Sequence, residues 1–582
     1  MQITSQFDAL ARSNLNSTVG AFVAEVIARL GVELVITCPG SRSTPLTIGA
    51  TRNSKLETLS ILDERSAAFF ALGHAKATHK PVVLICTSGT ACANFFPAIV
   101  EAQLSGVPLI VFTADRPFEL RNCAAGQVID QTKIYGDYVN AFYEIGLPEK
   151  GTDYLDYLRQ TLVHAVNQSI GQVLGPVHLN FSFREPLSPD TENTPIISAE
   201  DLERSASVIV RTTELSVPVV SIDPLLIERL SSHRRGIIIV GTVEPIFEDP
   251  TFVASLSAVS KQLGWPIIAD VLNPVRNNAD AFGLLVTHYD TFLKDPNFKE
   301  SLKPSAILQV GPLPTSKVLR SWVEESKAHQ FLLSDGSRNI DSLHGFSVPL
   351  NGSVVSLAKG LSQSMADKEW NGLWDQAEAY YEKAVANKLD ALEGVFEGQF
   401  SAWLSEYTPI NTSIFIANSM SVRYAEAFWK KSNSKNKIFF NRGANGIDGT
   451  LSTAMGIAHK GNPVVLLCGD LAFLHDINGL LASKSLKGKL TILLMNNNGG
   501  GIFEHLPIAG HSSFENYFAT PQEVDFEQLC VAHKVAYQAA EDKASLLQCL
   551  EDLNQSGIKV LEVKTDRKKD VLTFQNLKAV LT

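Results

Sequence analysis

The sequence has no excess of positive charge and no apolar run long enough to cross a bilayer. Its 582 residues carry a formal net charge of −11, which argues against a protein that grips nucleic acid through a basic face. The longest apolar segments, such as 490–495, fall far short of the ~18 residues that a membrane span needs. Residues 1–8 lack the basic and apolar segments of a secretory signal, so we expect a cytoplasmic protein.

Cysteine is also scarce, and its spacing carries no pattern. The chain has seven cysteines without a CxxC pair or a His/Cys spacing typical of zinc. We therefore expect reduced thiols that pack as small hydrophobic side chains. No Gly-x-Gly-x-x-Gly turn follows a predicted strand, which disfavours a dehydrogenase with a dinucleotide-binding fold.

The chain does contain a repeated segment. Residues 81–86 read Pro-Val-Val-Leu-Ile-Cys and residues 463–468 read Pro-Val-Val-Leu-Leu-Cys, and both have the apolar, β-rich character of a buried parallel strand. Each follows a helical stretch of small residues and precedes a polar turn, a helix and a second strand, at 107–113 and 489–495. We interpret the two segments as copies of one supersecondary unit.

The spacing within the repeat is also kept. From Cys86 to Asp115 the distance is 29 residues, and it is again 29 residues from Cys468 to Asn497. Strands that alternate with helices in this way predict parallel sheets with helices on both faces.

The length and the pattern between the copies predict further organisation. We expect an α/β chain with three doubly wound parallel-sheet domains, because 582 residues exceed what one core organises. The expected domains are 1–190, 191–365 and 366–582, with a charged helical bridge over 367–392. The strands of the central domain are expected at 236–241, 266–271, 306–311 and 330–334.

Two polar loops follow neighbouring strands near the C-terminus. Asp470 follows the strand 464–468, and Asn497 lies in the Asn-Asn-Asn-Gly-Gly turn after the strand 490–495. Carboxylate, carboxamide and main-chain carbonyl oxygens suit Mg²⁺, which commonly bridges phosphates. A helix over 472–480 would offer its N-terminal amides to a diphosphate. Alternatively, Asp470 only caps this helix and the glycine-rich stretch is a simple turn.

This Gly-Asp pair, with Asn-Asn about 27 residues later, resembles the cofactor motif of thiamine-diphosphate-dependent enzymes. The repeated units resemble the pyrimidine-binding and diphosphate-binding domains of that family, which flank a central α/β domain. The resemblance implies thiamine diphosphate, held through Mg²⁺ or Mn²⁺, as the cofactor. The usual motif continues with glycine, whereas Leu471 stands at that position here.

The N-terminal half contains a matching carboxylate. Glu64 comes after a predicted strand at 59–62 and at the start of a helix. In the family that the chain resembles, a glutamate at this position hydrogen-bonds the aminopyrimidine N1′ of the cofactor, so Glu64 is our candidate general acid and base. Alternatively, Glu64 is a carboxylate that stabilises the positive end of a helix dipole.

Four further segments narrow the resemblance to one branch. The loop 38–47, Cys-Pro-Gly-Ser-Arg-Ser-Thr-Pro-Leu-Thr, presents Arg42 at a strand end, where a guanidinium can bind a carboxylate. With the segments 113–117, 418–423 and 441–449, the chain resembles the family of 2-succinyl-5-enolpyruvyl-6-hydroxy-3-cyclohexene-1-carboxylate (SEPHCHC) synthases of menaquinone or phylloquinone biosynthesis.

The resemblance implies a transferase that acts on two dicarboxylates. The family decarboxylates 2-oxoglutarate and adds the product to isochorismate in a 1,4-addition, in homodimers or dimers of dimers with active sites at the subunit interface. A chain of net charge −11 needs cationic side chains in its cleft to attract such substrates. The alternatives are another thiamine-diphosphate-dependent carboligase or decarboxylase, similar to acetolactate synthase, and a non-catalytic paralogue.

Carried over by motif, the resemblance assigns roles to individual residues. The implied catalytic residues are Glu64, Ser41, Arg42 and Gln127. The implied substrate contacts are Arg116, Lys317 from the central domain, Arg423, Arg442, Ile502 and Phe503. The implied cofactor contacts are Glu64, Ser419, Met420, Ile447, Gly469, Asp470, Leu471, Asn497 and Gly499. The implied metal ligands are Asp470, Asn497 and Gly499.

Some of these residues also have simpler interpretations. A single arginine is more often a solvated surface charge, and Ile502 and Phe503 can be ordinary core residues. Three positions depart from the pattern of some family members, and they concern how isochorismate is bound rather than the cofactor; they are Gly126, Asp130 and Val318.

Overall fold

The computed structural model describes residues 14–189, 196–207, 221–244, 251–334, 339–553 and 556–579. The connector predicted near residues 190–195, with the boundary between the first two expected domains, lies outside the described residues. The chain divides into two compact units. The first comprises Met1–Val217, Asn441–Gly461 and His475–Gly488, and the second comprises Pro218–Phe440, Asn462–Leu474 and Lys489–Thr582.

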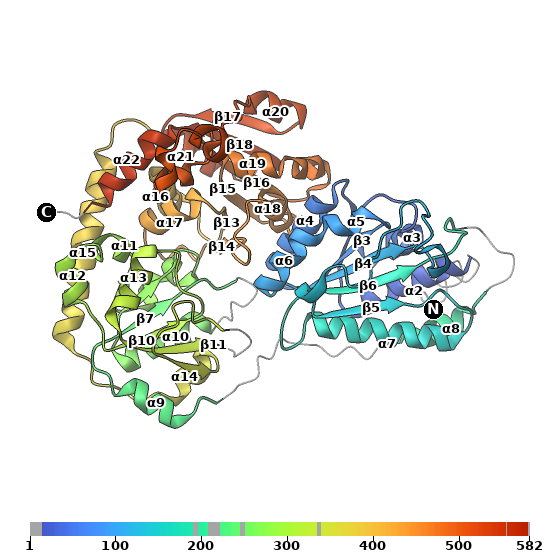
Figure 1. Cartoon of the computed structure of the whole chain (residues 1–582), viewed down its shortest axis with the longest axis horizontal. Coiled ribbons are helices and arrows are strands. Elements are labelled where there is room, and N and C mark those ends of the chain that lie inside the picture. Colours follow the sequence, from blue (N-terminus) through green and yellow to red (C-terminus); the bar gives the residue numbers. More distant parts are fainter. Residues whose placement is uncertain are drawn as a thin grey trace. The chain divides into compact units, whose positions relative to one another are not determined.

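The first unit contains a six-stranded parallel sheet in the order β2-β1-β3-β4-β6-β5, with helices on both faces (Figure 1). Its strands are β1 (Leu34–Thr37), β2 (Glu57–Ser60), β3 (Val82–Cys86), β4 (Leu109–Asp115), β5 (Ala141–Ile145) and β6 (Val177–Ser182). Its helices are α2 (Leu15–Arg29), α3 (Thr44–Arg52), α4 (Glu64–Thr78), α5 (Thr90–Asn94), α6 (Phe96–Ser105), α7 (Thr152–Ser169), α8 (Ala199–Ser205) and α18 (Thr450–Ala458).

Small residues let two helices of this unit approach closely. A Cβ atom added at Gly73 of α4 would lie 2.0 Å from the carbonyl oxygen of Thr453, and one added at Gly456 of α18 would lie 2.0 Å from that of Phe70. The small-residue stretches that precede the two repeated strands are therefore the contact faces of α4 and α18. Any larger side chain at either glycine would push the helices apart.

The second unit contains the other two sheets, each again with six parallel strands. The central sheet has the order β12-β11-β10-β7-β8-β9, with β7 (Gly236–Val240), β8 (Ile267–Ala269), β9 (Leu285–Val286), β10 (Ala306–Val310), β11 (His329–Ser334) and β12 (Ser347–Asn351). Its helices are α9 (Pro224–Ser231), α10 (Phe252–Leu263), α11 (Tyr289–Phe292), α12 (Pro296–Ser301), α13 (Lys317–Ser326) and α14 (Val354–Gly360).

The last sheet has the order β14-β13-β15-β16-β18-β17, which repeats the order of the first sheet. Its strands are β13 (Ser413–Ile416), β14 (Lys437–Phe439), β15 (Pro463–Gly469), β16 (Lys489–Asn496), β17 (Ala536–Ala540) and β18 (Gly557–Lys564). Its neighbouring helices are α15 (Lys368–Asp390), α16 (Glu397–Tyr407), α17 (Met420–Phe428), α19 (Asp470–His475), α20 (Phe526–Ala532), α21 (Lys543–Glu551) and α22 (Arg567–Leu577).

Helix α15 is the predicted bridge. Its Trp370 and Trp374 pack into the core beside the central sheet, whereas Val385 and Leu389 pack into a cluster with residues of α17. One continuous helix thus contributes to two hydrophobic cores of the second unit. The prediction of three doubly wound parallel sheets is confirmed.

Two local predictions were wrong. The strand predicted at 59–62 is β2, which ends at Ser60 and leaves Leu62 65% exposed. The helix predicted over 472–480 begins earlier, at Asp470, ends at His475, and is followed by a 3-10 helix over Ile477–Ser485. The break coincides with Asp476, whose buried carboxylate accepts a hydrogen bond from the Ser452 amide of α18 at 2.7 Å.

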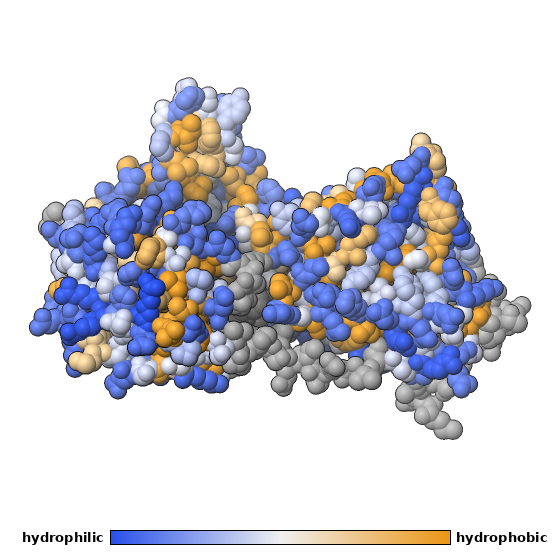
Figure 2. All heavy atoms as spheres, turned by 60° about the horizontal axis from the view of Figure 1, so that its bottom comes forward, coloured by the Kyte–Doolittle hydropathy of each residue, from blue (hydrophilic) through white to orange (hydrophobic). Residues whose placement is uncertain are grey.

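The surface is mixed, with apolar patches between larger hydrophilic areas on the face drawn in Figure 2. Within the described ranges, no helix combines the length and the apolar character that a membrane crossing requires. All seven cysteines are free, and six of them are buried.

Candidate functional site

Glu64 is the first residue of α4, at the end of the loop that follows β2. The helix is capped by Asp63, whose side chain accepts a hydrogen bond from the Ser66 amide at 3.1 Å. Glu64 itself is half-buried, and its Oε2 accepts a hydrogen bond from Asn94 Nδ2 at 3.2 Å. Burial, together with the charges of Glu64 and Asp63, raises the pKa of the Cys38 thiol. β1 pairs with β2 so that Thr37 lies opposite Ser60, which places the loops with Cys38 and Glu64 at the same edge of the sheet.

That loop places Arg42 inside the first unit. The Arg42 side chain is buried, donates a hydrogen bond to the Phe183 carbonyl at 2.9 Å and forms an ion pair with Glu185 at 3.1 Å. Its Nε is buried and has no hydrogen-bond partner among the described residues. Burial and the charge of Arg116 lower the pKa of Arg42, and Glu185 opposes this shift. The neighbouring Ser41 is exposed.

Arg116 and Gln127 meet at Ser88. One guanidinium nitrogen of Arg116 donates to Ser88 Oγ at 3.4 Å, and another donates to the Gly126 carbonyl at 3.0 Å. Gln127 Nε2 donates to the Ser88 carbonyl at 2.9 Å, and Ser88 Oγ donates to the Gln127 carbonyl at 3.0 Å. Position 126 thus contributes a main-chain carbonyl, so its identity as glycine does not remove this contact. The exposed Asp130 accepts a hydrogen bond from the Thr132 amide at 2.9 Å.

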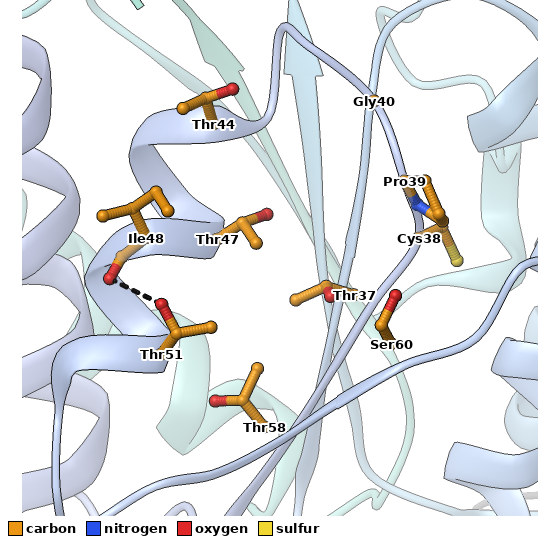
Figure 3. A pocket seen from close by; sticks show the side chains of 10 residues that line it. All are labelled: Thr37, Cys38, Pro39, Gly40, Thr44, Thr47, Ile48, Thr51, Thr58 and Ser60. Carbon is orange, nitrogen blue, oxygen red and sulfur yellow. Dashed lines mark hydrogen bonds between the residues drawn. The ribbon is translucent and has the colours of Figure 1, made fainter. Parts of the chain in front are cut away.

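The loop with Cys38 also lines a cavity of about 240 Å³ (Figure 3). Hydroxyl groups dominate its wall, from residues of β1, α3 and β2. Thr58 Oγ1 is buried there without a hydrogen-bond partner in the described part of the chain. The lining residues are Thr37, Cys38, Pro39, Gly40, Thr44, Thr47, Ile48, Thr51, Thr58 and Ser60.

A buried polar network beneath Ser88 was not predicted from the sequence. Gln131 Oε1 accepts a hydrogen bond from the Gly89 amide at 2.9 Å, and Gln131 Nε2 donates to Asn180 Oδ1 at 2.9 Å. Asn180 Nδ2 in turn donates to Asp115 Oδ2 at 3.0 Å, and Arg121 forms an ion pair with the same oxygen at 2.9 Å. The available signal was the alternation of apolar residues in β6 with His178, Asn180 and Ser182.

Two C-terminal candidates, Arg442 and Ile447, lie in the 441–461 segment of the first unit. The amides of Gly443 and Ala444 donate to the Glu101 carboxylate of α6 at 2.9 and 2.7 Å. Ile447 is half-buried, and its carbonyl accepts a hydrogen bond from Thr450 Oγ1 at 2.7 Å. These contacts hold the segment that carries both candidates.

In the second unit, the two predicted polar loops meet. Asp470 is 5% exposed, and its Oδ2 accepts a hydrogen bond from the Gly499 amide at 2.7 Å. Its Oδ1 accepts from the Leu471 amide at 2.8 Å. Burial raises the pKa of Asp470 to about 6, against the opposing effect of these amides. β15 pairs with β16 so that Gly469 lies opposite Met495, which places both loops at the same edge of the sheet.

Asn497 presents one oxygen without a partner. Its side chain is buried, and its Nδ2 donates to Glu397 Oε1 at 2.6 Å. Its Oδ1 is buried and accepts no hydrogen bond from the described residues. Gly499 has φ +138°, and a Cβ there would lie 2.4 Å from the Ala519 carbonyl oxygen, so this turn requires glycine.

Two buried carboxyl groups lie behind this loop, and no sequence motif marks either of them. Glu397 is the first residue of α16 and Asp570 lies in α22, and both are buried. Burial and the charge of Asp570 raise the pKa of Glu397 to about 8, and burial raises the pKa of Asp570 to about 7. Among the described residues, neither of them forms an ion pair, and Asp470 forms none either.

The oxygen donors of this loop fit a hard cation. No group of three or more His, Cys, Asp or Glu side chains in the described ranges is placed to hold a metal ion. A cation here would therefore depend on amide and main-chain oxygens beside the single carboxylate of Asp470. The unpartnered Asn497 Oδ1 meets this requirement, because a buried carbonyl oxygen without a donor is costly unless something binds it.

Other candidates of the second unit lie at the start of α17 or in the segment that follows β16. Arg423 donates to the Ser419 carbonyl at 2.6 Å, and Ser419 has φ +67°. Met420 is buried in the cluster against which Ile502 packs. Phe503 packs edge-to-face on Phe518, with ring centroids 5.9 Å apart.

Lys317 is exposed at the start of α13. The helix is capped by Ser316, which accepts a hydrogen bond from the Leu319 amide at 3.1 Å and donates one to Asp290. Val318 is half-buried beside the central core. No hydrogen bond or ion pair joins Lys317 to the other described candidates, so the fold fixes its backbone but not its predicted role.

Three family descriptions match consecutive parts of the chain. Residues 17–134 match the N-terminal TPP binding domain of thiamine pyrophosphate enzymes, and residues 419–563 match the C-terminal TPP binding domain. Residues 227–416 match the middle domain of thiamine pyrophosphate enzymes. A solved structure from Mycobacterium smegmatis, described as that of a putative thiamin diphosphate-dependent enzyme, has the same fold; the match covers 93% of this chain and 98% of that chain, with a TM-score of 0.66 at 16% identity.

Curated relatives cover nearly the whole chain. A 2-succinyl-5-enolpyruvyl-6-hydroxy-3-cyclohexene-1-carboxylate synthase from Gloeothece citriformis is 44% identical over 562 residues, which is 96% of this chain and 97% of the relative. The enzyme of the same name from Trichodesmium erythraeum is 45% identical over 567 residues, with the same coverage. The chain therefore belongs to the thiamine pyrophosphate enzymes and, among them, to the SEPHCHC synthase family.

Proposed function

We propose that the chain decarboxylates 2-oxoglutarate and adds the resulting four-carbon unit to isochorismate by 1,4-addition. The product is 2-succinyl-5-enolpyruvyl-6-hydroxy-3-cyclohexene-1-carboxylate, an intermediate of menaquinone or phylloquinone biosynthesis. The names of the curated relatives support this reaction. The structural observation that supports it most is the contact between the two polar loops. The Gly499 amide donates a hydrogen bond to Asp470 at 2.7 Å, and Asn497 Oδ1 in the same loop has no partner among the described residues.

We assign the metal site to this loop. Asp470, the Asn497 amide oxygen and the Gly499 carbonyl would bind Mg²⁺ or Mn²⁺, with Gly469 and Leu471 beside the diphosphate. When bound, thiamine diphosphate supplies the electron sink that makes decarboxylation of a 2-oxo acid possible. Ser419, Met420 and Ile447 would contact its pyrimidine end. Because α19 has only six residues, its dipole is small, and we assign the diphosphate to the loop rather than to the helix N-terminus expected from the sequence.

Glu64 would hold a proton at the pyrimidine N1′ of the cofactor. A carboxyl group suits this role when water is excluded, because desolvation favours sharing a proton with the ring over full ionisation. In the single chain Glu64 is half-buried. Its role therefore predicts further burial when cofactor and a second subunit are present.

The guanidinium groups would bind the substrate carboxylates. The buried Nε of Arg42 has no partner in the described ranges, and Arg116 is close enough to lower the pKa of Arg42. Two positive charges held together in a chain of net charge −11 favour a dianionic ligand. Ser41, Gln127, Lys317, Arg423, Arg442, Ile502 and Phe503 complete the proposed substrate set.

The decisive experiment measures CO₂ release from 2-oxoglutarate with Mg²⁺ and thiamine diphosphate, with and without isochorismate. We expect release that depends on both cofactors and a product that forms only when isochorismate is present. Faster turnover of pyruvate would favour a carboligase similar to acetolactate synthase. An absence of thiamine diphosphate binding by calorimetry would favour a non-catalytic paralogue.

We further propose that the chain acts as a homodimer or a dimer of dimers in the cytoplasm, with the expected domains 1–190, 191–365 and 366–582. Large apolar side chains are exposed beside the candidates of the first unit, where Leu62 is 65% and Phe118 is 67% exposed. Exposed apolar side chains next to a site favour cover by another chain.

Mixing two inactive variants tests whether one site draws residues from two subunits. Co-expressed Glu64→Gln and Asp470→Ala chains would form hybrid dimers with one intact site, and we expect about a quarter of the wild-type activity from random pairing. No recovery, with hybrid dimers verified by affinity tags, would show that each site is built within one chain.

A further inference from the structure

Glu397 lies directly behind the proposed metal loop, although no motif marks it. It is 4% exposed at the start of α16, and its Oε1 accepts hydrogen bonds from two groups. Asn497 Nδ2 donates at 2.6 Å and Thr565 Oγ1 donates at 3.2 Å. The Thr565 amide donates to the Asn496 carbonyl at 2.9 Å, so strand β16 and the chain that follows β18 are joined at this point.

This contact decides which end of the Asn497 amide faces forward. An amide group has a donor nitrogen and an acceptor oxygen that are nearly equal in size, and its orientation is set by its hydrogen-bond partners. Glu397 Oε1 accepts hydrogen bonds from both Asn497 Nδ2 and Thr565 Oγ1, so the proton that a neutral Glu397 carries lies on Oε2, and Oε1 remains an acceptor. The nitrogen is therefore held toward Glu397, and the unpartnered oxygen points away from it.

We infer that Glu397 is a positioning residue, which holds the Asn497 amide in the one orientation that offers oxygen rather than nitrogen to the cation. This inference rests on the proposed metal site. In the reversed orientation an NH₂ group would face the cation, and it cannot serve as a ligand. Partners that orient metal ligands in this way commonly change metal affinity by about 10- to 100-fold when they are removed.

The chain offers a matched control one residue away. Asn496 Nδ2 donates to Glu562 Oε1 at 2.6 Å, and Glu562 is 3% exposed. This is also an asparagine–glutamate pair, with a half-buried asparagine as the last residue of β16. The Asn496 oxygen accepts a hydrogen bond from the Asn498 amide at 3.1 Å, so it already has a partner. Removing Glu562 takes a buried hydrogen-bond acceptor from Asn496 and Tyr537 of the same sheet, without freeing the amide of Asn497.

The test measures Mn²⁺ binding to the full-length dimeric protein in the presence of thiamine diphosphate, by calorimetry and by electron paramagnetic resonance. We compare wild type with E397L, E397Q and E562L, and monitor the folding of each variant by thermal unfolding. We expect E397L to weaken Mn²⁺ affinity by about 10- to 100-fold. We expect E397Q, whose amide oxygen can still accept from Asn497 Nδ2, and E562L to stay within about threefold of wild type.

Each other outcome contradicts the inference in a distinct way. Equal loss in E397Q and E397L would show that the carboxyl group of Glu397 is required, and that a hydrogen-bond acceptor at this position is not enough. Equal loss in E562L and E397L would indicate general loosening of the sheet, and unchanged affinity in E397L would show that Asn497 needs no such support. A wild-type protein that binds no Mn²⁺ with thiamine diphosphate would refute the proposed function itself.

Discussion

The first and last sheets have the same strand order, but the carboxylates at their loop edges differ in whether a cationic side chain pairs with them. In both sheets a buried cysteine is followed two positions later by one polar residue, and a second polar residue lies 29 positions after the same cysteine. These positions are Ser88 and Asp115 in the first sheet, and Asp470 and Asn497 in the last. Parallel strands bring each pair to one edge of its sheet, so both copies offer the same place for a ligand.

In the first sheet this place is filled by the chain's own cations. Arg121 forms an ion pair with Asp115 at 2.9 Å, and the Arg116 guanidinium donates to Ser88 Oγ at 3.4 Å. In the last sheet, Asp470 is buried and forms no ion pair among the described residues. In the proposed metal site the last sheet would take its cation from solution, whereas the first sheet has cations from the chain itself, so the side chains after the second strand distinguish the two copies.

The largest effect is expected at the last sheet. Asp470→Ala removes the only carboxylate of the proposed metal site, and we expect metal-dependent binding of thiamine diphosphate to weaken by more than about 100-fold. Calorimetry with and without Mg²⁺ measures this. Asp470→Asn serves as a control, because it keeps an acceptor for the Gly499 amide, which donates at 2.7 Å, while removing the charge. Unchanged affinity in both variants would mean that the metal site lies elsewhere.

Substitution of Glu64 beside the first sheet should lower the rate of turnover more than the affinity for the cofactor. Glu64→Gln keeps an oxygen that can accept from Asn94 Nδ2, which donates at 3.2 Å, but it removes the exchangeable proton. We expect cofactor affinity within a few-fold of wild type and CO₂ release slower by about 10²- to 10⁴-fold. Loss of the helix-start charge should cost no more than about 1 kcal/mol of stability. A variant with normal turnover would remove Glu64 from the mechanism.

A smaller effect should follow from pH. Burial raises the pKa of Asp470 to about 6, so in the metal-free folded chain this group gains a proton as the pH falls through 6. A cation must displace that proton, and the apparent Mn²⁺ affinity should fall by about tenfold for each pH unit below 6. The same titration of Mn²⁺ with free thiamine diphosphate is the control. An affinity that changes no more with pH than in this control would show that the carboxylate stays ionised throughout.

The sequence predicted the sheets and the meeting of the two polar loops for a physical reason. Buried parallel strands need continuous apolar runs, and the turns after them lie at one sheet edge, so the strand pattern alone was enough to place Asp470 and Asn497 together. The small residues around Gly73 and Gly456 were visible too. Their role in helix packing could not be predicted, because the close approach of α4 and α18 brings together segments that are far apart in the chain.

Other parts of the site could not be predicted. Glu397 and Asp570 carry no local pattern, and only the folded sheet brings Glu397 within 2.6 Å of Asn497. The early end of α19 coincides with the hydrogen bond between the Asp476 carboxylate and the Ser452 amide, which is also a long-range contact. A helical pattern in sequence reports local preference, and tertiary hydrogen bonds can end a helix sooner.

The smallest effect is expected from a variant that tests whether metal binding depends on one carboxylate or also on the residues around it. Ser88→Asp gives the first sheet the carboxylate that Asp470 provides in the last. We nevertheless expect no additional bound Mn²⁺ per chain, because the Arg116 guanidinium, 3.4 Å from Ser88 Oγ, would pair with the new carboxylate. Electron paramagnetic resonance with Mn²⁺ measures the stoichiometry, and the double variant with Arg116→Ala is the matched comparison. A second Mn²⁺ in the single variant would mean that the carboxylate alone makes the site, and that the arginines of the first sheet do not replace a cation.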